Sequence, residues 1–143
     1  MPVITFFEED ISYNIRNKIK LKQWIKAAII EEGFRLDELT YVLCSDEYLL
    51  KMNQQYLDHD TYTDIITFDN AEEEGIITGD IFISIPRIKE NAAKFSVSEV
   101  DELHRVIIHG ALHLLGYKDK AAADKKKMTQ KEDYYLAKRA FNN

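Results

Sequence analysis

The sequence predicts an α+β fold in which a mixed four-stranded sheet packs with about five helices. Two observations predict it. Runs with the spacing of strands and helices follow one another in the order β-α-β-α-β-β-α-α-α. A short polar loop, NAEEEG, joins the third and fourth strand runs and predicts an antiparallel pair. We expect the helices to pack mainly on one face of the sheet. The length of 143 residues predicts a single domain, residues 1–143, with one core.

Four runs rich in β-branched and aromatic side chains predict the strands. They are VITFF (3–7), LTYVLCS (39–45), TDIITFD (63–69) and TGDIFISI (78–85). Short runs of this composition, bounded by polar residues or glycine, are typical of half-buried or buried strands. The second run is apolar almost throughout, which predicts a strand inside the sheet.

Five segments have helical spacing or helix-start signals. They are residues 21–33, 45–57, 86–95, 96–116 and 122–141. Gly33 ends the first, Ser45 is a candidate N-cap of the second, and Pro86 can occupy the first turn of the third. The last is amphipathic. The sequence therefore predicts a helix between most pairs of strands and three helices in succession after the last strand.

The segment 96–116 is the longest periodic one. Ser98 with Asp101, or Ser96 with Glu99, resembles a capping box at its start. Its apolar residues lie on most sides of the helix, which predicts a central, buried position.

The charges are unevenly distributed. The net charge of −6 argues against a general nucleic-acid binder, yet residues 37–80 hold 12 acidic and 1 basic side chains, whereas residues 118–139 hold 8 basic and 4 acidic ones. Such asymmetry can orient a polyanion toward the basic end. A solvated helix face explains the same lysines equally well.

Composition limits the class of protein. No apolar run approaches the roughly 18–20 residues that span a bilayer, and the start, MPVITFFEED, lacks the pattern of a signal peptide. The lone cysteine, Cys44, lies in an apolar run, where we expect it to pack as a small hydrophobic side chain. A cytoplasmic protein without a membrane segment is the resulting expectation.

The stretch HGALHLLGYKD, residues 109–119, contains the candidate metal ligands. His109 and His113 are four residues apart, so a helix aims both imidazoles at one point. Gly116 can end the helix and let the chain turn back, which would bring Asp119 to the same point. Two imidazoles and one carboxylate around Zn²⁺ leave one position open for water, which is typical of a catalytic zinc site.

Gly110 follows the first histidine and has two readings. A glycine inside a helix costs about 1 kcal/mol relative to alanine, so it indicates either close helix packing or room for substrate or water beside the metal. The spacing also matches the zinc-peptidase pattern HExxHxxGxx(H/D), but Gly110 stands where that pattern has its glutamate base.

HGALHLLGYKD resembles the hallmark HGxLHLxGYDH of the YbeY endoribonuclease family. A second stretch, NQQYLDHDTYTDIITF (53–68), resembles the family block N-x-x-Y-R-x-x-D-x-x-T-(D/N)-(V/I)-(L/I)-(S/T)-F, and GDIFIS (79–84) resembles the family's GDI strand. The hallmark matches are His109, Gly110, Leu112, His113, Leu114, Gly116 and Tyr117. Those of the second block are Asn53, Tyr56, Asp60, Thr63, Asp64, Ile65, Ile66, Thr67 and Phe68.

The resemblance implies a zinc-dependent, single-strand-specific endoribonuclease that acts in 16S rRNA 3′-end maturation and ribosome quality control. It implies one Zn²⁺ per chain, with His109, His113 and Asp119 as metal ligands that act catalytically through metal-bound water. The implied partners are single-stranded RNA (the 16S rRNA precursor) and the small ribosomal subunit with its associated proteins.

Two positions depart from the family pattern. Asp119 stands where the family usually has a third histidine, so we expect metal binding to survive with some tolerance for harder ions. Leu57 stands where the family has an arginine thought to contact RNA phosphate. Arg105, Lys118 and Lys120 are candidates to replace that charge.

The remaining polar residues receive supporting roles. We expect Asp64 and Asp80 to be structural or to hold a ligand imidazole by its far N–H, and Asp60 to tighten the turn before a strand. His59 is expected in a solvent-facing loop, and His104 as a surface or packing residue. The general base is not identified.

Two alternatives stay open. The first is a ribosome-associated RNA- or protein-binding module with a structural metal, which the missing arginine and the acidic surface favour. The second is a zinc hydrolase of another substrate, such as a peptidase, against which the missing glutamate counts.

Overall fold

The computed structural model describes residues 2–139 and 141, and its elements follow the predicted order. They are β1 (Val3–Glu9), α1 (Lys18–Glu31), β2 (Arg35–Cys44), α2 (Asp46–Leu57), β3 (Ile65–Asp69), β4 (Ile76–Ser84), α3 (Ile85–Phe95), α4 (Glu99–Leu114) and α5 (Ala122–Leu136). The predicted α+β class with a mixed four-stranded sheet is confirmed. The last helix is shorter than predicted because it ends at Leu136; Ala140, inside the predicted range, lies outside the described residues.

The sheet has the strand order β1-β2-β4-β3. β2 pairs in parallel with both β1 and β4, whereas β3 pairs antiparallel with β4. The parallel pairs require crossover connections, which α1 and the segment containing α2 and β3 supply. The short loop between β3 and β4 joins the antiparallel pair, as its length and composition predict.

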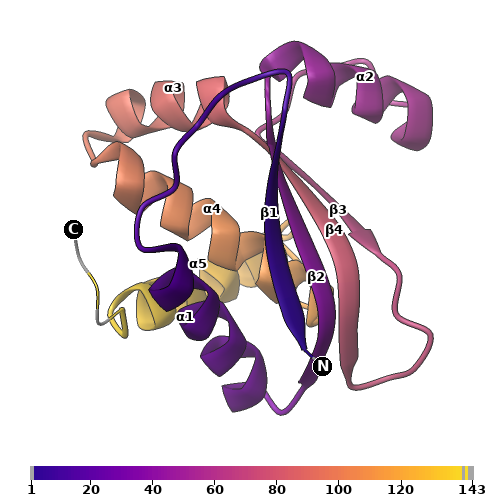
Figure 1. Cartoon of the computed structure of the whole chain (residues 1–143), viewed down its shortest axis with the longest axis vertical. Helices are drawn as coiled ribbons and strands as arrows, with labels where there is room; N and C mark the ends of the chain where they lie inside the picture. The colour runs from indigo at the N-terminus through magenta and orange to yellow at the C-terminus, as the bar shows by residue number, and fades with distance from the viewer. Residues whose placement is uncertain (1, 140, 142–143) are drawn as a thin grey trace.

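The helices α1, α3, α4 and α5 cover one face of the sheet, and α2 lies on the other (Figure 1). Side chains of α1, α3, α4 and α5 share the larger core with alternate residues of β4, including Ile81 and Ile83. Phe82 points to the opposite face and packs with Leu49 of α2 in a smaller cluster. The expectation that the helices pack mainly on one face is met, with α2 as the exception.

The position of α4 explains Gly110. A Cβ added at Gly110 would lie 2.9 Å from Ile65 Cδ1 in β3 and 3.0 Å from Ile81 Cδ1 in β4. Gly110 therefore lets α4 approach the sheet closely, so the packing reading is correct. The other reading, room for substrate or water beside the metal, is wrong, because the space beside Gly110 is filled by core side chains.

The helix starts follow the predicted caps. Ser45 Oγ accepts a hydrogen bond from the Tyr48 amide at 3.1 Å, and Ser98 Oγ accepts one from the Asp101 amide at 3.0 Å. Pro86 lies in the first turn of α3. These local hydrogen bonds fix where α2 and α4 begin and thus the register of the histidines along α4.

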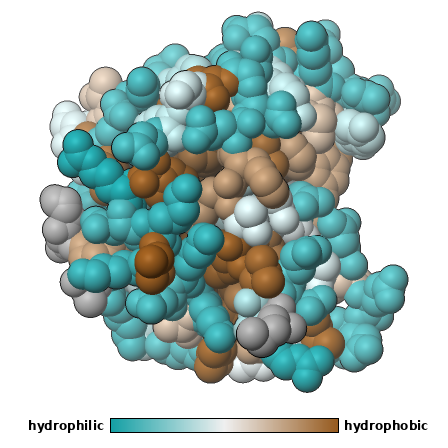
Figure 2. All heavy atoms as spheres, viewed as in Figure 1, coloured by the Kyte–Doolittle hydropathy of each residue, from teal (hydrophilic) through white to brown (hydrophobic). Residues whose placement is uncertain are grey.

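The surface is largely hydrophilic on the face in Figure 2, where apolar side chains show only in separate patches. Cys44 is buried, as predicted for a small hydrophobic side chain. Among the helices that the structure describes, none combines the length and apolar character needed to cross a bilayer.

Candidate metal centre

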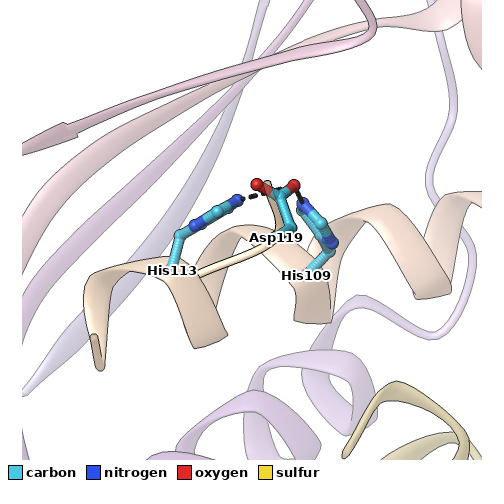
Figure 3. Close-up of side chains that lie close together, drawn as sticks. All are labelled: His109, His113 and Asp119. Carbon is cyan, nitrogen blue, oxygen red and sulfur yellow. Dashed lines mark hydrogen bonds and ion pairs between the residues drawn. The ribbon is translucent and has the colours of Figure 1, made fainter. Parts of the chain in front are cut away.

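Three side chains meet beside the C-terminal half of α4 (Figure 3). His109 and His113 project from α4, and Asp119 comes from the loop that leads to α5. Each Nε2 atom of the two imidazoles lies 3.2 Å from Asp119 Oδ2. One ligand atom from each residue can be chosen so that all three lie within 4.8 Å of one another, and the group could hold a metal ion.

The turn after α4 places Asp119. Gly116 has a φ of +107°, which favours glycine. Its amide donates to the His113 carbonyl at 3.0 Å, and the Tyr117 amide donates to the Leu112 carbonyl at 3.1 Å. These two hydrogen bonds form a Schellman motif, which ends the helix and reverses the chain. The reversal brings the Asp119 carboxylate back over the two rings.

The other ring nitrogens determine where the protons lie. His113 Nδ1 is 3.0 Å from the Tyr117 carbonyl oxygen, and His109 Nδ1 is 2.6 Å from Glu132 Oε2 in α5. A carbonyl and a carboxylate only accept hydrogen bonds, so both Nδ1 atoms donate. In a neutral imidazole the Nε2 atom then carries a lone pair. Two nitrogen lone pairs and a carboxylate oxygen thus face one another, an arrangement that a cation stabilises.

The donor set fits zinc. Ligands at about 2.0–2.1 Å from Zn²⁺ on the corners of a tetrahedron are about 3.3 Å apart. The two separations of 3.2 Å between nitrogen and oxygen agree with this spacing. Imidazole nitrogen suits zinc and other transition metals, whereas the carboxylate oxygen also suits harder ions.

Charges behind the rings affect His109. Arg105 Nη1 donates to Glu132 Oε1 at 2.7 Å, and Arg105 Nη2 donates to Asp133 Oδ1 at 2.6 Å. Burial opposes the charged imidazole, but the hydrogen bond to Glu132, with the negative charges of Glu132, Asp119 and Asp64, raises the pKa of His109 above its ordinary value. The surroundings of His109 therefore favour positive charge at the site.

Asp64 and Asp80 are expected to be structural or to hold a ligand imidazole, and the second of these roles is wrong. Glu132 and the Tyr117 carbonyl take that position. Asp80 accepts instead from Asn70 Nδ2 at 3.0 Å. Asp64 influences His109 through its charge, with no hydrogen bond to either ring among the described residues.

Sequence reasoning missed Glu132. It lies 23 positions after His109, in a helix whose many charged residues predict a solvent-exposed surface. A signal was present, because Met128, Glu132 and Tyr135 have helical spacing and form the buried stripe of α5. An acidic side chain in such a stripe needs a buried partner.

The other predicted residues lie away from the metal ligands. His59 is exposed in the loop after α2, as expected, and Asp60 accepts from Gln54 Nε2, which ties that loop to α2. His104 is buried and packs against Trp24, so it is a packing residue.

The candidate phosphate-binding residues differ in their environment. Arg105 is held by two carboxylates. Lys118 and Lys120 are exposed and flank Asp119 in the chain. Leu57 is exposed at the end of α2 and supplies no charge. The two lysines are therefore better placed than Arg105 to contact an anion.

Comparisons with known proteins give consistent matches. A family model described as Endoribonuclease YbeY matches residues 4–140. The chain is 52% identical over 138 residues to a protein named Endoribonuclease YbeY from Cytophaga hutchinsonii, covering 96% of each chain. It is 47% identical over 130 residues to one of the same name from Flavobacterium psychrophilum, covering 91% of this chain and 92% of the relative. A solution structure of a Thermotoga maritima protein is similar with a TM-score of 0.65 and 28% identity, over 94% of this chain and 87% of that one.

Proposed function

Because the chain belongs to the Endoribonuclease YbeY family, we propose that it is a zinc-dependent endoribonuclease specific for single-stranded RNA. We further propose that it acts in maturation of the 16S rRNA 3′ end and in ribosome quality control. Membership of the family supports the endoribonuclease role, and the arrangement of the three candidate ligands supports the dependence on metal.

A single observation carries the metal assignment. Both Nδ1 atoms donate to fixed acceptors, so the Nε2 lone pairs of His109 and His113 converge on the carboxylate oxygen of Asp119. When both rings are neutral, these three electron-rich atoms repel one another unless a proton or a metal ion lies between them. We propose that His109, His113 and Asp119 hold one Zn²⁺ per chain, which when bound supplies Lewis acidity toward a phosphodiester and activates water for attack.

The position of Gly110 counts against a peptidase. Zinc peptidases of the HExxH type carry a glutamate base directly after the first histidine. Here a Cβ at position 110 would lie 2.9 Å from Ile65 and 3.0 Å from Ile81 in the core, closer than van der Waals contact allows. The helix face that would carry the base is thus turned into the sheet, so the alternative of an HExxH peptidase lacks a place for its base.

The RNA substrate needs basic side chains near the metal ligands. Lys118 and Lys120 flank Asp119 and are exposed, and Lys125 and Lys126 are exposed in the first turns of α5. We propose that these lysines contact phosphates of single-stranded RNA and take the place of the charge that Leu57 lacks. Partners on the small ribosomal subunit and a cytoplasmic location follow from a ribosomal RNA substrate.

Elemental analysis and RNA cleavage test the proposal. We expect about one zinc per chain, strongly reduced in His113→Ala. Cleavage of single-stranded RNA by the purified protein should stop with a chelator and return with zinc. If the protein bound RNA but never cut it under any metal condition, the RNA-binding module would be the correct function instead of the nuclease. A full metal content in His113→Ala would refute the assignment of the metal ligands.

A further inference from the structure

Glu132 is an acidic side chain inside the protein, with only 6% of its surface exposed. Both carboxylate oxygens have partners: Oε2 lies 2.6 Å from His109 Nδ1, and Oε1 lies 2.7 Å from Arg105 Nη1. A buried carboxylate is tolerated only when it is paired in this way. Its position is therefore fixed from two sides, by two residues one turn apart on α4.

The contact with His109 fixes both the ring and its tautomer. Because the carboxylate accepts only, His109 must carry a proton on Nδ1, which leaves Nε2 as the atom that faces Asp119. Without Glu132 the ring could carry its proton on Nε2 instead, where it would block metal binding. It could also rotate away from the other two ligands.

Arg105 makes the contact depend on α5. Its guanidinium holds Glu132 through Nη1 and Asp133 through Nη2, the latter at 2.6 Å and on the exposed side. Asp133 thus shares Arg105 with Glu132, and its ion pair is with Arg105 rather than with His109. A change at Asp133 therefore weakens the link between α4 and α5 without removing a contact to the His109 ring, whereas a change at Glu132 affects both.

We propose that Glu132 is a positioning residue for metal binding, which holds His109 in the tautomer and orientation that the metal requires, and that Arg105 holds Glu132 in place. The proposal rests on the proposed metal site. Outer partners of metal-binding histidines of this kind contribute about 10- to 100-fold to metal affinity. Glu132 lies outside the motif HGALHLLGYKD and is not one of the three candidate metal ligands.

The test compares Glu132→Gln with the control Asp133→Asn. Glutamine has the same shape, but its amide NH₂ would face either the Arg105 guanidinium or the His109 N–H, donor against donor. We expect the zinc affinity, measured by competition with a chromophoric chelator, to fall about 10-fold or more in Glu132→Gln and to change less than about 3-fold in Asp133→Asn.

A second readout does not require metal. Nitrogen-15 NMR of the metal-free protein, recorded at a pH at which the imidazole of His109 is neutral, reports its tautomer. His109 should then show one tautomer protonated at Nδ1 in the unaltered protein and in Asp133→Asn, and a mixture in Glu132→Gln. Equal zinc affinities and equal tautomer signals in the two variants would overturn the proposal. If the unaltered protein bound no zinc, the proposed metal site would fail separately, whatever the tautomer of His109.

Discussion

Acidification should destabilise the protein through His104, which is buried in the core. The residue is 5% exposed, and its ring packs against Trp24 and Phe141 with centroid distances of 5.9 and 5.6 Å. Its Nδ1 is 2.8 Å from Arg139 Nη1. A guanidinium only donates, so Nδ1 accepts and the imidazole is neutral in the folded protein.

The size of the effect follows from the pKa of His104. Burial, and then the charge of Arg139, lower this pKa from 6.5 to about 4, while Asp101 opposes the shift in part. Above pH 6.5 the ring is neutral in both the folded and the unfolded chain, so it does not change the free energy of unfolding. Between pH 6.5 and about 4 the unfolded chain binds a proton that the folded protein does not, so stability falls as the pH falls. The loss of stability is about 1.4 kcal/mol for each pH unit in this range, and it approaches about 3 kcal/mol at pH 4.

Urea unfolding from neutral pH to about pH 4 measures this loss, with metal removed and His104→Gln as the comparison. Carboxylates titrate in both proteins, so the difference between the two pH profiles isolates His104. We expect the unaltered protein to lose about 3 kcal/mol more than the variant across this range. Profiles with the same slope would refute a neutral, buried His104, even if the variant were less stable at every pH.

Three further predictions concern packing, the ligand loop and RNA. Gly110→Ala should destabilise the protein in urea unfolding, because overpacking costs about 1–3 kcal/mol and the gain in helix propensity is only about 1 kcal/mol; a stabilised variant would contradict the close contact with the sheet. Tyr117→Phe removes a hydroxyl that donates to Glu32 Oε1 at 2.6 Å, so thermal or urea unfolding should show a loss of about 1.5–3 kcal/mol, and an unchanged stability would mean that the hydrogen bond contributes nothing. Replacing Lys118 and Lys120 by glutamine should lower the salt dependence of single-stranded RNA binding, measured by fluorescence anisotropy, by about 0.7 in log–log slope for each phosphate that the variant no longer binds; an unchanged slope would place the phosphates elsewhere.

Local features of the fold were predictable from the sequence because they depend on neighbouring residues. The Ser45 and Ser98 caps, Pro86 in the first turn of α3 and the loop between β3 and β4 each involve contacts within a few positions. The position of α2 on the opposite face of the sheet was not predicted. It depends on which face of β4 carries Phe82, and this becomes clear only once the strand order is known.

The candidate site divides in the same way. His109, His113 and Asp119 were identified together because one helix and the turn after it bring them together. Glu132 was not identified, since its spacing from His109 has no fixed geometry until α5 packs on α4. Gly110 stayed ambiguous for a similar reason, because a glycine in a helix shows that something lies close without showing what it is.

The proposed metal site should therefore depend on the packing of helices that contribute no ligand. All three ligands lie within eleven consecutive residues, yet the orientation of His109 depends on Glu132 of α5. His113 is held by the Tyr117 carbonyl, and the Tyr117 hydroxyl donates to Glu32 at the C-terminal end of α1. A chain in which α4 has formed but α1 and α5 have not docked would contain every ligand and still lack the fixed lone pairs. Metal affinity and tertiary packing are then coupled, so bound zinc should stabilise the contacts of α1 and α5 with the α4 turn as well as the turn itself.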